Sequence, residues 1–132
     1  MNTGRASRLL FALIVLGMVA LILRLRLLPF DFVWDGRVPW ERATLAPLTI
    51  RDVPLNVLLF APLGFGLAGL LAGRGGAARR PWAIAGWTVA LCVLFSAALE
   101  GAQFFLPERV PSLADVIANG LGALLGAALF NG

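Results

Sequence analysis

Seven polar residues stand out against the apolar background of this sequence, and their types and spacing suit binding or acid/base chemistry. They are Asp52, Asn56, Glu100, Gln103, Arg109, Asp115 and Asn119. Arg109 stands alone, whereas the other six form pairs three or four residues apart, which places both members of a pair on one helix face. Amide groups donate and accept hydrogen bonds, so they suit an amide-bearing ligand. The carboxylates and the arginine would set its charge and orientation.

The sequence also excludes several kinds of site. It contains no His, and all 11 basic residues are Arg, so a histidine general base and a histidine-ligated metal are excluded. Cys92 is the only cysteine, which rules out an internal disulfide and a cysteine metal cluster. Ser96 lies one helical turn before Glu100 without an evident base. We expect no metal, no cofactor and a binding protein rather than an enzyme; Glu100 and Asp115 as an acid/base pair are the enzymatic alternative.

The composition is that of a membrane protein. Of the residues, 60% are hydrophobic and 14% charged, and the mean hydropathy is +0.89, whereas soluble domains average about 45–50% apolar and about 25% charged residues. The net charge of +4 comes from arginines scattered between apolar blocks, which do not form the basic stripe of a nucleic-acid-binding protein. We expect the lipid bilayer as a partner and no nucleic acid.

The apolar runs predict an all-α bundle of four transmembrane helices in a single domain over residues 1–132. The helices are expected at about 9–28, 53–72, 82–106 and 113–130, with an extramembrane loop at 29–51. Arg24 and Arg26 are expected to extend from the end of the first helix to the membrane interface. Pro107 is expected to stop the third helix.

The orientation depends on the arginines outside the apolar runs. With the N-terminus in the cytoplasm, five arginines lie inside and six outside, so the positive-inside count does not decide. The weight of the first helix and the purely basic loop before Trp82 favour a cytoplasmic N-terminus in the plasma membrane.

Four antiparallel helices would bring the seven polar residues to one membrane face, in one shallow layer. Simpler interpretations compete. Thr49 and Ser112 precede Asp52 and Asp115 at the spacing of a capping box. In this interpretation the two acids cap their helices and have no further role. The amides could be interhelical hydrogen bonds, worth about 0.6–2 kcal/mol each. Glu100 is costly inside a spanning segment and needs a partner or a water-filled cavity, with Arg109 as the expected counter-charge.

A short pattern occurs twice in the chain. Residues 49–58 and 112–121 both follow [ST]-x-x-D-V-x-x-N-x-L. Both copies open helices that are predicted to run in the same direction. The fold is therefore predicted to repeat a two-helix unit about an axis along the membrane normal.

These residues also resemble the motifs of the VanZ-like family of small bacterial membrane proteins. The similar segments are Pro29-Phe30-Asp31, Asp52-Val-Pro-Leu-Asn56, Phe60-Ala-Pro62-Leu-Gly64-Phe65, Glu100-Gly-Ala-Gln103, Pro107-x-Arg109 and Ser112-x-x-Asp115-Val-x-x-Asn119-x-x-Gly122. The resemblance covers about residues 28–130, and the family pattern matches all seven polar residues. It implies a multi-helix membrane fold. The family is named for a protein that gives low-level resistance to the glycopeptide teicoplanin.

Together, the residues and the resemblance predict an outward polar pocket that binds a cell-envelope ligand. Lipid-linked cell-wall material or a glycopeptide would fit. Family membership alone does not transfer antibiotic resistance to this chain. The structural alternative is that the polar layer only joins the helices of a small partner subunit. The oligomeric state is left open.

Overall fold

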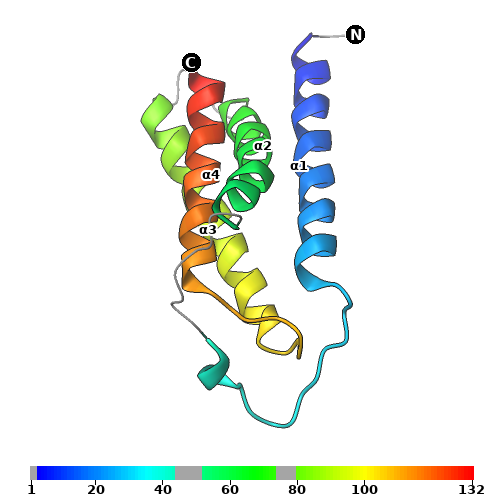
Figure 1. The fold of residues 1–132 in the computed structure, drawn as a ribbon. Coiled ribbons are helices and arrows are strands. Elements are labelled where there is room, and N and C mark those ends of the chain that lie inside the picture. The colour runs from blue at the N-terminus through cyan, green and yellow to red at the C-terminus, as the bar shows by residue number, and fades with distance from the viewer. Residues whose placement is uncertain (1–2, 44–51, 74–79) are drawn as a thin grey trace.

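The computed structural model describes residues 3–43, 52–73 and 80–132, and this part of the chain is helical (Figure 1). The elements are α1 (Thr3–Leu27), the 3-10 helix η1 (Trp40–Arg42), α2 (Asp52–Ala72), α3 (Pro81–Gln103) and α4 (Leu113–Asn131). All four α-helices are long and apolar enough to cross a membrane. The predicted fold class, a bundle of four transmembrane helices, is confirmed.

Successive long helices alternate in direction (Figure 1). Both termini therefore lie at one end of the bundle, and the segment that carries η1 lies at the other. We call this second end the loop end. It gathers the last turns of α1 and α3 and the first turns of α2 and α4, as the antiparallel prediction requires.

Two helix ends differ from the expected ones. α1 begins at Thr3 rather than near residue 9. Its first turns are polar, so hydropathy detects only the apolar part of the helix that follows them. α3 ends at Gln103 rather than at Leu106. The amides of the next residues bond carbonyls three residues back, which forms a tight turn ahead of Pro107.

Small residues let α2 and α4 approach until their backbones touch. A Cβ added at Gly126 would overlap the backbone of Ala61 and Phe65, and one added at Gly64 would overlap the backbone of Ala123. Without a hydrophobic force between helices in lipid, such close packing is a main source of association. This interface fixes the positions of the first turns of α2 and α4 at the loop end.

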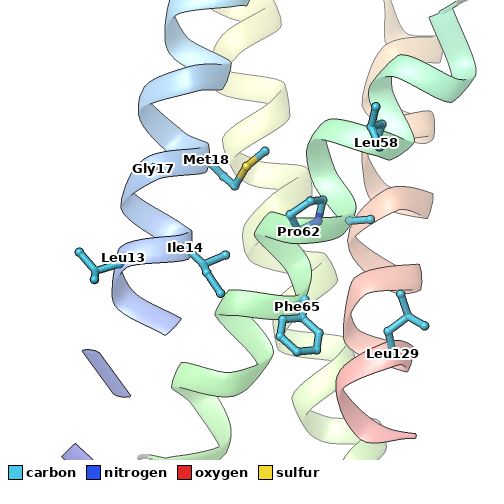
Figure 2. A pocket seen from close by; sticks show the side chains of 9 residues that line it. Leu13, Ile14, Gly17, Met18, Leu58, Pro62, Phe65 and Leu129 are labelled. Carbon is cyan, nitrogen blue, oxygen red and sulfur yellow. The ribbon is translucent and has the colours of Figure 1, made fainter. Parts of the chain in front are cut away.

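α1 packs against α2 and leaves most of its surface exposed. Near the chain termini, the Phe11 ring covers Gly69, and its centroid lies 6.0 Å from that of Phe65 and 5.6 Å from that of Phe130. Closer to the loop end, an apolar groove of about 560 Å³ lies between α1 and the α2–α4 pair (Figure 2). Its lining residues are Leu13, Ile14, Gly17, Met18, Leu58, Ala61, Pro62, Phe65 and Leu129. None of the described residues that line it has a polar side chain, so these residues offer nothing to orient a polar ligand.

Candidate functional site

Arg26 is the centre of a polar cluster at the loop end. Its Nη1 donates to Asn56 Oδ1 at 3.0 Å, and its Nη2 donates to Glu100 Oε1 at 2.6 Å and to Asp115 Oδ2 at 2.8 Å. The arginine comes from the last turn of α1, and its three partners come from α2, α3 and α4. One guanidinium therefore connects all four helices. We call these four residues the Arg26 cluster.

The partners of Arg26 are themselves held in place. Asn56 donates from Nδ2 to Asp115 Oδ1 at 3.1 Å, and Glu100 Oε2 accepts from the Ser112 amide at 2.7 Å. The side chains of Arg26, Glu100 and Asp115 are 15%, 8% and 19% exposed. Ion pairs strengthen as solvent is removed, but burial makes each charge costly if its partner is lost. The cluster thus couples the ends of the four helices electrostatically.

Gln103 and Arg109 contact the end of α1 through its backbone. Gln103 Nε2 donates to the Arg26 carbonyl at 3.1 Å. The Arg109 guanidinium donates to the carbonyls of Leu25 and Leu28, with Nη2 at 3.0 Å from each. A helix leaves its last carbonyls without partners, and these two side chains satisfy three such groups near the end of α1. Both residues therefore hold the end of α1, which carries Arg26, in place.

The prediction that Arg109 is the counter-charge of Glu100 is wrong. Arg26 pairs with Glu100, whereas the described bonds of Arg109 go to backbone carbonyls. Arg26 was expected to extend from the helix end toward the interface. Its guanidinium is held by the carboxylates of Glu100 and Asp115, and its side chain is 15% exposed. Arg24, two residues earlier, is exposed.

Asn119 lies outside the cluster, one turn deeper along α4 than Asp115. Its Nδ2 donates to Ser96 Oγ at 2.7 Å, and both side chains are fully buried. Ser96 lies one turn before Glu100 on α3, so the pair forms a second polar contact beneath the first. The expectation of one shallow layer therefore holds for Asn56, Glu100 and Asp115 and is wrong for Asn119.

The structure bears differently on the capping interpretation of Asp115 and on that of Asp52. Ser112 is the residue before α4, but its side chain makes no capping hydrogen bond. Asp115 instead accepts from Arg26 and Asn56, so capping alone does not explain it. Asp52 is the first residue of α2 and is exposed. Thr49, its expected capping partner, lies outside the described residues.

Arg42 of η1 was not recognised from the sequence. It donates to the carbonyls of Phe104 at 2.7 Å and Leu106 at 2.6 Å, and also to those of Pro107 and Arg109. The ring centroids of Trp40 and Phe104 lie 5.2 Å apart. This arginine holds η1 against the turn between α3 and α4. A single arginine in a proline-rich loop gives no signal of this role, because its acceptors are backbone atoms.

A pocket of about 470 Å³ opens between η1, α3 and α4, next to the Arg26 cluster. Trp40 and Phe104 line one side, and Ala97, Gly101 and Val116 line the helix walls. Glu100 lines this pocket and also belongs to the cluster, so it connects the two. We call this cavity the Glu100 pocket. Its polar lining is small and its apolar lining large, which suits an amphiphilic ligand.

Within residues 3–43, 52–73 and 80–132, no group of three or more His, Cys, Asp or Glu could hold a metal ion. The chemistry that the site offers in these residues is charge, hydrogen bonding and an apolar cavity.

Comparison with known proteins identifies one family. A model described as VanZ/LLP1 matches residues 6–131, nearly the whole chain. No curated protein and no solved structure matches it. The match includes all four helices and every residue of the Arg26 cluster and the Glu100 pocket.

Proposed function

The chain belongs to the VanZ/LLP1 family, and we propose that it is a binding protein that holds a cell-envelope ligand in the Glu100 pocket. The observation that carries the proposal is the position of Glu100. This carboxylate is nearly buried, is held by Arg26 and Ser112, and faces a cavity of about 470 Å³ whose other walls are mainly apolar. An intramembrane carboxylate facing a cavity is by default a functional feature.

The proposed ligand is lipid-linked cell-wall material or a glycopeptide such as teicoplanin. The family resemblance supports this class. A pocket of about 470 Å³ with one carboxylate among mainly apolar walls would hold an amphiphilic part of such a ligand. We propose that the N-terminus lies in the cytoplasm and that the loop end faces outward in the plasma membrane. The pocket would then open where envelope material is present.

Ligand-induced stabilisation tests this function. The purified protein would be melted in one neutral detergent with and without teicoplanin, and with and without a lipid extract of bacterial envelopes. A ligand that binds only the folded protein raises its melting temperature. We expect one of these additions to stabilise the wild type and to have a much smaller effect on Glu100→Gln.

The matched control is Asp35→Asn, which removes an exposed acid from the same end of the molecule. It should respond to the ligand like the wild type. An unchanged melting temperature with every addition would contradict the proposed function. So would an equal shift in the wild type and Glu100→Gln, because the ligand would then bind elsewhere.

An enzymatic function is the second candidate, because Glu100 and Asp115 accept hydrogen bonds from the same nitrogen of Arg26. Two carboxylates this close could share acid and base roles on a lipid-linked substrate. Both are engaged by Arg26, which favours binding over proton transfer. Turnover of a lipid-linked substrate that disappears in Glu100→Gln would reverse this preference.

A further inference from the structure

We infer that the Glu100 pocket selects an amphiphile with a protonated amine, whose ammonium group lies at Glu100 and whose apolar part lies between α3 and α4. This inference rests on the proposed function and narrows its ligand class to envelope amphiphiles and glycopeptides that place a free amine, and not a phosphate, at Glu100. It combines the charge of the Arg26 cluster, the hydrogen-bonding capacity of Glu100 and the form of the pocket.

The Arg26 cluster has an excess of negative charge in the contacts that the structure describes. One guanidinium is bonded to two carboxylates, those of Glu100 and Asp115. Arg42 and Arg109 lie at the same end of the bundle, but their described hydrogen bonds go to backbone carbonyls. A buried charge needs compensation. A cation in the adjoining pocket would supply it.

Glu100 has the capacity to bind such a cation. Its Oε1 accepts from Arg26 and its Oε2 accepts from the Ser112 amide. An ionised carboxylate offers about four acceptor sites, so two of them remain for a ligand beside the bonds that the described residues make. An ammonium group donates up to three hydrogen bonds, whereas a sulfate or phosphate would meet the carboxylate with like charge.

The pocket walls favour a cation joined to an apolar chain. Trp40 and Phe104 line the same pocket as the Glu100 carboxylate, and a cation is attracted to the faces of aromatic rings. Ala97, Gly101 and Val116 leave room between the helices for an alkyl group. A free metal ion would use none of these apolar walls. The combination therefore fits an alkylammonium head better than a bare cation or a neutral alcohol.

Three short amphiphiles with the same chain distinguish these possibilities: octylammonium, octanol and octyl sulfate. Each would be titrated into the full-length protein in a neutral detergent, with tryptophan fluorescence as the readout. The Trp40→Phe variant identifies the Trp40 component of that signal. We expect octylammonium to bind at least about tenfold more tightly than octanol, a difference of about 1.4 kcal/mol, and octyl sulfate to bind most weakly.

A pocket-filling variant tests the location. A Cβ atom added at Gly101 meets no atom within 4 Å, and Gly101 lines the pocket, so we expect Gly101→Leu to fold and to place its side chain in the pocket. Gly86 on the same helix is equally open and lies outside this pocket, which makes Gly86→Leu the matched control. We expect Gly101→Leu to weaken octylammonium binding about tenfold or more and Gly86→Leu to leave it unchanged.

Equal affinity for octylammonium and octanol would overturn the inference, and so would unchanged binding to Gly101→Leu. The proposed function fails separately. If an envelope lipid or teicoplanin binds with dependence on Glu100 but octylammonium shows no preference, only the ammonium selectivity is wrong. If octylammonium binds as expected but no envelope material does, the pocket chemistry is supported and the proposed function is contradicted.

Discussion

Arg26 determines how the polar residues of this protein are used. It contacts α2, α3 and α4 together, through Asn56, Glu100 and Asp115. Removing one member of a buried ion pair costs more than the pair itself contributes, because the remaining charge has no partner. The residue that stabilises the site is therefore also the one whose loss should be most damaging.

We predict that Arg26→Gln destabilises the protein by about 3–5 kcal/mol, because Glu100 and Asp115 would face each other without a cation. The free energy of unfolding in a neutral detergent measures this change. Arg24→Gln on the same helix is the control. Its side chain is exposed, and its effect should stay within about 0.5 kcal/mol.

The triple variant Arg26→Gln, Glu100→Gln, Asp115→Asn separates charge from packing. Neutralising both acids should recover part of the stability that Arg26→Gln loses, since no unpaired carboxylate remains. Strictly additive losses would show that the three residues act independently.

The sequence identified most of the site but not its organising residue. Helix-face spacing and depth correctly brought together Asn56, Glu100 and Asp115. Arg26 was missed because a basic residue near a helix end ordinarily extends to the interface. The informative signal was the charge balance: two acids at one depth require a cation from another helix, and Arg26 ends its helix at that depth.

At the scale of elements, the backbone contact between α2 and α4 sets the position of their first turns. A Cβ at Gly126 would overlap backbone atoms of Ala61 and Phe65, which cannot move as a flexible side chain would. Small residues four apart, such as Gly122 and Gly126, allow close helix packing in lipid, but this spacing does not determine which helices meet. That choice depends on tertiary contacts that no single helix encodes.

We predict that Gly126→Ala destabilises the protein by about 1–3 kcal/mol, because the added methyl group forces α2 and α4 apart. Thermal unfolding in detergent provides the measurement. Gly86→Ala, at a position with nothing within 4 Å, should leave the melting temperature unchanged or slightly raised. Equal effects at both positions would show that backbone contact is not what makes Gly126 necessary.

Residues 28–43, which follow α1, are held to the turn between α3 and α4 by two kinds of contact. Arg42 donates to carbonyls of that turn, and the Val33 amide donates to the Phe105 carbonyl at 2.8 Å. We predict that Arg42→Gln speeds hydrogen exchange at the Val33 amide about tenfold or more, because charge-assisted hydrogen bonds contribute about 1.5–3 kcal/mol. Exchange followed by mass spectrometry provides the readout.

Arg37→Gln is the matched control for Arg42. Arg37 lies in the same segment, is 77% exposed and pairs with Asp35 at 3.6 Å. Its substitution should leave exchange at Val33 unchanged. If both variants exchange at the wild-type rate, Arg42 does not hold this segment.

At the scale of the whole molecule, four spans place both termini on one side of the membrane (Figure 1). The arginine count did not decide which side, because arginines outside the four long helices also serve structural roles, as Arg42 and Arg109 do here. The predicted two-helix repeat stays a prediction. Its matching residues differ in their contacts, since Asn56 bonds Arg26 and Asp115 while Asn119 bonds Ser96.

Cysteine labelling in intact cells tests the proposed orientation. The native Cys92 is fully buried, so the wild type should resist a membrane-impermeant maleimide and serve as the control. Asp35→Cys should react in intact cells, whereas Gly4→Cys should react only after permeabilisation. The reverse pattern would place the Glu100 pocket on the cytoplasmic side.

The ligand that the protein carries through purification tests most directly the claim that the Glu100 pocket holds an envelope ligand. The wild type, Gly101→Leu and Gly86→Leu would be purified in parallel at matched yield, and their bound amphiphiles quantified by mass spectrometry. We predict one amphiphile in stoichiometric amount with the wild type and Gly86→Leu, and its loss from Gly101→Leu. The same profile from all three proteins, or no specifically retained amphiphile in any of them, would contradict the claim and favour a polar layer that only joins helices.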